Sequence, residues 1–327
     1  MSHDQFSALS DQAIAAAAVV YFLALLCHLW QWALLRRTTP VEAAVPELAT
    51  VGGGAGEGTS DKAPTHPSAS SEVDDRPELF SRIGVSLTVL AAVLHAIADV
   101  ARGLAADPAR VPWGNMYEFT LTATMVVGIA YLLLYKHFSL DWLSPVVVAF
   151  ILVTLMVDVL VLYAPVVPLR DALDSPWLVI HVVAAIIATG AFTLGGMASA
   201  LYLIKERWPG KLAGGYLSRI PNLEALDRFA YRVQAFAFPV WTFAALIAGP
   251  IWAQHAWGSY WNWDPKEVWA FITWVVYAAY LHARATAGWK GRAAAIVALI
   301  GLATLWFNFV GINYFFGSGS MHSYAGG

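Results

Sequence analysis

Long apolar runs alternate with short polar connections along almost the whole chain. A helix of about twenty apolar residues spans the hydrocarbon core of a membrane. The runs lack the period-2 alternation that marks the strands of a membrane β-barrel. The pattern therefore predicts an all-α, polytopic membrane bundle of about eight transmembrane helices. The expected spans cover residues 13–35, 82–104, 116–136, 142–163, 177–204, 233–254, 267–287 and 293–315.

Two connections between spans differ from the others in composition. Residues 38–80 combine five prolines with a Gly-Gly-Gly run and polar residues, which bury too little apolar surface to fold. We expect a flexible cytoplasmic linker there, between a first transmembrane helix in residues 1–37 and a membrane domain in residues 81–327. In the connection before the sixth span, Pro221 and Asn222 predict the start of an interfacial helix that leads into that span.

The basic residues predict how the spans are oriented. Lys and Arg concentrate in the odd-to-even connections, as at Arg36 and Arg37, and are sparse in the even-to-odd ones. Because basic connections stay on the cytoplasmic side, both termini and the loop at 254–266 are expected outside the cytoplasm. We expect a multi-pass protein of a bacterial inner membrane, with a thylakoid membrane as the alternative.

Composition excludes several classes of protein. Fifty-nine per cent of the residues are hydrophobic and 13% are charged, about half the charged fraction of a soluble globular chain. Cys27 is the one cysteine, so an intrachain disulfide, a CxxC redox pair and a cysteine-based zinc site are excluded. The HExxH motif of zinc peptidases does not occur. Membrane lipid is an expected partner, and nucleic acid is not.

The stretch WGSYWNWDPKEVW, residues 257–269, is the most informative part of the sequence. It holds four tryptophans, a tyrosine and a turn-forming Asp-Pro pair. Two interpretations stay open. The rings form either an aromatic belt at the membrane interface or a concave wall for a flat apolar ligand. Asp264 also suits the N-cap of the following helix, a role that needs no ligand. The candidate residues of this loop are Trp257, Tyr260, Trp261, Trp263, Asp264 and Pro265.

The string WGSYWNWDPKE resembles the WWD signature of the haem-handling proteins of cytochrome c biogenesis. Its WDPKE form is similar to the CcsA (ResC) family of the system II pathway, and the resemblance covers most of residues 80–327. The string VPWGNMYEF, residues 111–119, resembles the N-x-Y-E element of the same family through Asn115 and Glu118. For this element, packing beneath the aromatic loop and direct haem contact stay equal alternatives.

The resemblance implies a haem-transporting subunit of a haem lyase, the holocytochrome c synthase. Haem b would cross the membrane and be presented to the CxxCH motif of apocytochrome c. The separate CcsB (ResB) subunit is the implied partner. A thiol-reducing protein is also implied, because this chain has no cysteine pair. Lys266 or Arg170 could pair with the haem propionates, although an ordinary interfacial charge explains each equally well.

The resemblance also implies roles for individual residues. His181 and His322 correspond to the external axial ligands of haem iron, and His282 corresponds to an intramembrane ligand that acts with a histidine of CcsB. Trp257, Trp261, Trp263 and Asp264 would form the haem platform. Asn115, Glu118, Tyr260 and Pro265 are supporting candidates.

Three further histidines, His28, His95 and His255, have no assigned role. His28 and His95 lie inside apolar spans, where a histidine invites a functional hypothesis. Paired at one depth, they would suit a quinone-linked b-type cytochrome, but that function leaves the aromatic loop unexplained. A secondary transporter of another ligand is the other alternative, and it predicts inverted repeats that the sequence does not display.

Overall fold

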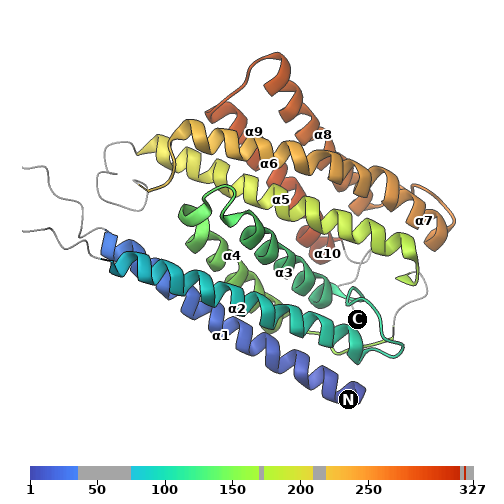
Figure 1. Ribbon diagram of the computed structural model, residues 1–327. Coiled ribbons are helices and arrows are strands. Elements are labelled where there is room, and N and C mark those ends of the chain that lie inside the picture. Colours follow the sequence, from blue (N-terminus) through green and yellow to red (C-terminus); the bar gives the residue numbers. More distant parts are fainter. Residues whose placement is uncertain (36–74, 169–172, 209–218, 317–319, 322–327) are drawn as a thin grey trace, which may run out of the picture.

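The computed structural model describes residues 1–35, 75–168, 173–208, 219–316 and 320–321, and its regular elements are helices (Figure 1). The helices in chain order are α1 (His3–Leu35), α2 (Arg76–Ala105), α3 (Met116–Tyr135), η1 (Leu140–Leu143), α4 (Ser144–Val157), η2 (Asp158–Leu162), α5 (Pro176–Arg207), α6 (Leu223–Phe243), η6 (Ala244–Ala248), α7 (Gly249–Trp257), α8 (Pro265–Thr286), α9 (Arg292–Trp306), η7 (Phe307–Gly311) and α10 (Ile312–Phe315). The elements η2, η6 and η7 are π-helical turns.

Helix occupies each of the eight predicted spans, so the all-α membrane bundle is confirmed. Seven helical segments of the described chain are long and apolar enough to cross a membrane. Helix α8 falls outside that set because it is rich in aromatic residues and carries charged groups at both ends. The assignment of sides to the membrane remains a prediction. Figure 1 shows the start of α1 and α7 at the same end of the bundle.

Three helices begin well before the predicted spans. Helix α1 begins at His3, ten residues before the predicted span at 13. Helix α2 begins at Arg76, six residues before the predicted span at 82, because Pro77 suits a first helical turn.

Helix α6 begins at Leu223, where the Asn222 side chain accepts a hydrogen bond from the Ala225 N–H at 2.8 Å. The helix start predicted at Pro221 and Asn222 is therefore confirmed, and the helix continues into the sixth span without a break. The interfacial position of its first turns remains a prediction. Most of the predicted linker lies outside the described residues.

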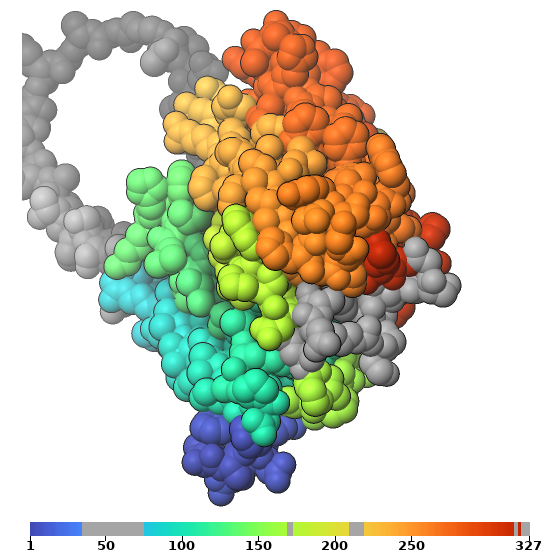
Figure 2. Space-filling model, turned by 90° about the vertical axis from the view of Figure 1, so that its right-hand side faces the viewer, coloured from blue at the N-terminus to red at the C-terminus, as the bar shows by residue number. Residues whose placement is uncertain are grey.

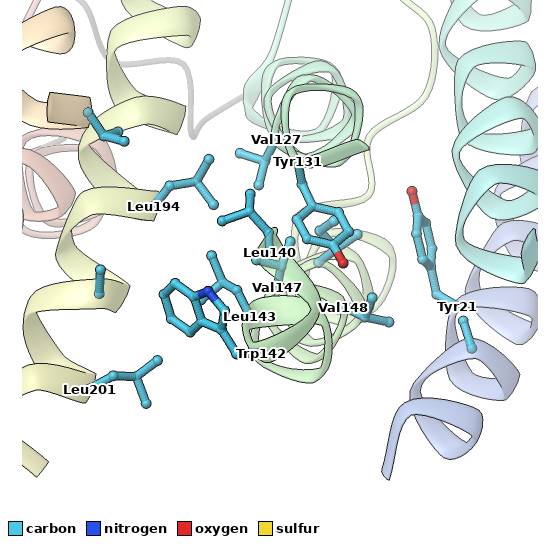
Figure 3. Packing of buried hydrophobic residues seen from close by; sticks show 14 of the residues in the cluster. Tyr21, Val127, Tyr131, Leu140, Trp142, Leu143, Val147, Val148, Leu194 and Leu201 are labelled. Carbon is cyan, nitrogen blue, oxygen red and sulfur yellow. The ribbon is translucent and has the colours of Figure 1, made fainter. Parts of the chain in front are cut away.

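The main apolar core is built around α3 and α4. Figure 3 shows side chains of α3, η1 and α4, among them Val127 of α3 and Trp142 of η1, between α5 on one side and Tyr21 of α1 on the other. The Tyr131 hydroxyl donates to Ser144 Oγ at 2.6 Å, which satisfies a polar group that would otherwise be costly inside the bundle. This core fixes α3 against α5, and α3 and α5 form two walls of the cavity described below.

A buried ion network fixes the first turns of α3. Glu118 accepts from Arg102 Nε at 3.3 Å and from Arg110 Nη1 at 2.7 Å. The Gly114 N–H donates to the same carboxylate at 2.8 Å, and Arg102 also donates to the Ala164 carbonyl. The Arg102 and Glu118 side chains are 0% and 1% exposed. The network therefore joins α2, α3 and the segment after α4.

Replacing Glu118→Gln should strongly destabilise the protein. The substitution leaves Arg102 and Arg110 without their buried counter-charge, and breaking a buried pair on one side costs about 3–5 kcal/mol. The measurement is the free energy of unfolding in mixed detergent micelles. Glu78→Gln is the matched control, because its pair with Arg82 is exposed and is worth at most about 1 kcal/mol. Equal losses in the two variants would contradict a stabilising role for the buried network.

Candidate functional site

A cavity opens at the end of the bundle where α7 meets α8. Including its open mouth it encloses about 1160 Å³, and its walls come from α3, α5, η6, α7, α8 and η7. On α5 it extends from Leu178 to Thr189, a depth of about 16 Å along the helix. Figure 2 looks onto this end of the molecule, with α7 and α8 in orange and α1 at the opposite edge.

Helix α5 and the π-helical turn η6 position His181 at the cavity wall. Its Nδ1 lies 2.9 Å from the Ala244 carbonyl oxygen. A carbonyl only accepts hydrogen bonds, so Nδ1 carries the proton and Nε2 is the nitrogen suited to bind a metal. The ring lies parallel to Trp252, with centroids 6.1 Å apart. A Cβ at Gly249 would lie 3.2 Å from the imidazole, so glycine gives the ring its space.

The polar groups of the loop hold its non-helical backbone. Helix α7 ends at Gly258, whose φ of 76° suits glycine. Asp264 and Glu267 then form a capping box at the start of α8. Glu267 Oε2 accepts from the N–H groups of Asn262 at 2.8 Å and Asp264 at 3.2 Å. Trp263 adopts a φ of 56°, in the left-handed region of backbone conformation. This conformation is unfavourable for a bulky residue, so the surrounding contacts have to stabilise it.

The three candidate tryptophans occupy different environments. Trp261 lines the cavity together with Tyr260. Trp257 packs edge-on against Trp252, with centroids 5.5 Å apart, and supports the wall from behind. Trp263 is 74% exposed and meets Trp261 edge-on at 5.9 Å. One of the three rings thus faces the cavity, one supports the wall, and one points to the surface.

Asp264 connects the loop to the C-terminal segment of the described chain. Its Oδ1 accepts from the Lys266 N–H at 2.9 Å and from Ser320 Oγ at 2.8 Å. Its Oδ2 accepts from the Met321 N–H at 2.7 Å. The side chain does not line the cavity. His322, the residue after Met321, lies outside the described residues, as does Arg170.

The supporting candidates separate into two groups. Asn115 lines the cavity and caps α3 by accepting from the Glu118 N–H at 2.9 Å. Glu118 belongs to the buried ion network and does not line the cavity. Lys266 and Glu267 line the cavity as neighbours in the first turn of α8, whereas Pro265 supplies the first residue of that helix.

His282 lies far from the cavity. It is on α8 seventeen residues after Pro265, a distance of about 25 Å along the helix, and its side chain is exposed. His255 is exposed too, and its Nδ1 bonds the Ile251 carbonyl one turn back at 2.7 Å. The structure therefore brings His181 to the cavity, and places His282 on the outer surface of the bundle.

His28 and His95 are buried in the α1–α2 hairpin at different depths. His28 Nε2 lies 3.4 Å from Thr88 Oγ1, whereas the His95 ring meets Tyr21 edge-on at 6.1 Å. Thr88 and His95 are seven residues apart on α2, or about 10 Å along its axis. This arrangement lacks the matching depths that a pair of histidines in a b-type cytochrome needs.

Sequence reasoning missed several cavity residues. Trp252 stacks on His181, and Trp113 and Trp241 line other walls. Each is a single tryptophan near an apolar run, a pattern typical of ordinary core packing. The cavity-lining part of η7, Asn308 and Phe309, was missed as well. An asparagine inside the last span was the one available signal, because polar residues within a membrane helix are expensive.

Comparison with known proteins identifies the family. A family model described as "Cytochrome C assembly protein" matches residues 113–318, which include every wall of the cavity. A cytochrome c biogenesis protein CcsA from Guillardia theta is 34% identical over 267 residues, 74% of this chain and 85% of the relative. The chain belongs to the CcsA family.

Other members of the CcsA family match a smaller part of the chain. The relative from Chlamydomonas reinhardtii is 43% identical over 157 residues, which is 48% of this chain and 43% of that relative's length. The relative from Mesostigma viride is 32% identical over 245 residues, 67% of this chain and 78% of its own length. Helices α1 and α2 both precede the residues matched by the family model.

A solved structure shares the fold. The protein titled "Cytochrome c Heme Lyase CcmF" superposes with a TM-score of 0.59 at 15% identity. The match covers 95% of this chain and 49% of CcmF, so α1 and α2 belong to the shared architecture although the family model leaves them out. This chain spans about half the length of CcmF.

Proposed function

We propose that this protein carries haem b across a bacterial inner membrane and presents it for covalent attachment to apocytochrome c. The proposal develops the established role of the CcsA family in cytochrome c biogenesis. It includes CcsB as the partner subunit and the aromatic loop on the outer side. The single observation that carries it is the cavity in which the loop residue Trp261 and the α5 residue His181 meet.

The cavity suits a flat ligand that carries a metal. Aromatic walls with few polar groups are typical of cofactor sites. The protonated Nδ1 of His181 directs Nε2 toward metal ligation, the usual arrangement for an axial histidine. Lys266 lines the same cavity from α8, and its ammonium group is a proposed partner for a haem propionate. His322 is the proposed second axial ligand, by its resemblance to the family pattern.

His282 is the proposed ligand where haem enters from the cytoplasm. Its side chain is exposed on α8, so a second ligand for the same iron has to come from another chain. CcsB is the proposed source. An exposed histidine at one end of α8 and a cavity at the other support two successive haem sites, the first shared with the partner and the second within this chain.

The covalent step belongs to haem and apocytochrome. Each thiol of the CxxCH motif adds across a haem vinyl group, forming a carbon–sulfur bond and placing the thiol hydrogen on the other vinyl carbon. The protein holds the haem and the thiols in the orientation that reacts, and it excludes other orientations. Cys27 is its one cysteine, so the thiols have to be reduced by a separate protein.

Replacing the proposed ligands with alanine should change the visible spectrum of the purified complex with CcsB. His181→Ala and His322→Ala should each lower the low-spin haem at the outer site, because each removes one axial nitrogen. His282→Ala should lower total haem content, because haem no longer enters. His255→Ala is the control, since its Nδ1 bonds its own helix. An unchanged spectrum in all three ligand variants would overturn the assignment.

The tryptophans should differ in their effect on haem retention. Trp261→Ala removes part of the cavity wall. Haem content and covalent maturation of a co-expressed apocytochrome should each fall by about tenfold or more, because a large aromatic contact with the haem is lost. Trp263→Ala removes an exposed ring and should leave haem content within about twofold of wild type. Haem retention that depends on Trp263 more than on Trp261 would contradict the proposed platform.

A further inference from the structure

We propose that Asp99 and Asp158 form a buried site that binds one proton, behind the cavity wall to which Trp113 contributes. Asp99 lies on α2, and Asp158 is the first residue of the π-helical turn η2. Their carboxylates interact electrostatically, and both residues are buried, Asp158 completely. Ionisable groups inside a membrane bundle often belong to paths for protons. The site goes beyond the proposed function, which gives neither residue a role.

The charges buried around the site do not balance when every carboxylate is ionised. Three carboxylates interact here, those of Asp99, Glu118 and Asp158. In the described part of the chain, the cations paired with them are Arg102 and Arg110 of the ion network. An uncompensated charge is expensive in an apolar interior. One bound proton removes the excess negative charge, so the group is balanced when one of its carboxyl groups is protonated.

The contacts of Thr122 need a hydrogen that an ionised Asp99 does not supply. Thr122 Oγ1 lies 2.7 Å from Asp99 Oδ1 and 3.1 Å from the Glu118 carbonyl oxygen, and it accepts from Trp113 Nε1 at 3.2 Å. A threonine hydroxyl donates one hydrogen, whereas an ionised carboxylate and a carbonyl can only accept. With a proton on Asp99, the carboxyl group donates to Thr122, and Thr122 donates to the Glu118 carbonyl. Each of the three contacts then has its own hydrogen.

Asp158 offers the second position for the proton. Neither of its carboxylate oxygens has a hydrogen-bond partner among the described residues. The Tyr117 hydroxyl and Arg102 Nη1 are buried without acceptors, and both residues interact with Asp158. The guanidinium of Arg102 repels a metal cation, and the described residues hold no group of three or more His, Cys, Asp or Glu suited to a metal. A proton is therefore the ligand that fits, and two interacting carboxyl groups bind it as a pair.

Other titratable groups face the site from α1, α2, α3 and the segment after η2. His95 precedes Asp99 by one turn of α2, but no hydrogen bond joins the two side chains. Tyr117, which interacts with the buried carboxylates, meets Tyr163 edge-on at 5.2 Å. Tyr163 is 49% exposed, and its hydroxyl donates to Asp11 of α1 at 3.2 Å. Tyr117 thus lies between the site and groups that water reaches, which gives the proton a path to the surface.

The site is also bonded to the wall of the cavity. Trp113 lines the cavity, and its Nε1 is linked to Asp99 through the Thr122 hydroxyl. A charged ligand in the cavity changes the electrostatic potential at Asp99, so ligand binding and proton binding affect each other. In this respect alone the inference rests on the proposed function, because the ligand that tests the coupling is haem.

Replacing either aspartate with asparagine should remove the bound proton, because the carboxylate that remains is balanced in its ionised form. In the purified complex with CcsB at neutral pH, the infrared carbonyl band of a buried, protonated carboxyl group should vanish in Asp99→Asn and in Asp158→Asn. Each single variant should keep the equilibrium constant for unfolding within about tenfold of wild type. The double variant leaves an arginine without a counter-charge and should raise that constant about a hundredfold. Asp4→Asn, at an exposed position, is the matched control.

The pattern across the variants decides the proposal. A wild-type protein without the band, or a band that survives either single substitution, overturns the shared proton. A double variant as stable as the single ones overturns the charge balance on which the site rests.

Haem provides the test of the coupling. Adding haem to the wild-type complex should shift the carboxyl band, and the shift should be absent from Asp99→Asn. Haem that binds and leaves the band unchanged overturns the coupling to the cavity. Failure of haem to bind overturns the proposed function instead, and the band and the double variant still decide the proton site.

Discussion

The site depends on one constraint, the need to satisfy the backbone of a non-helical loop at the boundary of an apolar bundle. Lipid offers no hydrogen-bond partners, so irregular backbone at this depth has to be bonded by the protein. The carboxylates of Asp264 and Glu267 meet this need. Glu267 holds the N–H groups of the loop, and Asp264 holds both α8 and the C-terminal segment. The rings of Tyr260 and Trp261 line the cavity, and the backbone that follows them is fixed by Glu267 through the N–H groups of Asn262 and Asp264.

The cavity exists because the helices around it deviate from regular packing. The π-helical turns η6 and η7 contribute wall residues, and such turns often mark functional sites because they break the regular side-chain rows. Gly249 leaves room for the ring of His181, which a Cβ at this position would approach to 3.2 Å. The carbonyl of Ala244 then sets the tautomer of His181. The turn η6 thus contributes both wall residues and the carbonyl that orients the imidazole.

Sequence patterns predict the spans well because the hydropathy of about twenty consecutive residues decides whether a segment can span the membrane. The cap at Asp264 was predictable for the same reason, from an Asp-Pro-x-Glu string. Other features depend on distant partners. From the sequence Trp252 resembles an ordinary core residue, and its place beside His181 depends on the packing of α5 against α7. The hydrogen bond from the Met321 N–H to Asp264 likewise links residues 57 positions apart. The helix start at Leu223 was predictable as well, because the N-cap residue Asn222 is a local signal.

The two ends of α8 differ in a way that bears on how the protein has to operate under the proposed function. At one end His181 points into a cavity enclosed by this chain, so iron bound there would be held within one subunit. At the other end His282 is exposed, about 25 Å away along the helix. Haem would first bind at a site that needs a ligand from another chain, and would then move to a site whose ligands come from this chain. The partner is then required for loading, whereas release to apocytochrome is governed by the loop and by the C-terminal segment that Asp264 holds against it.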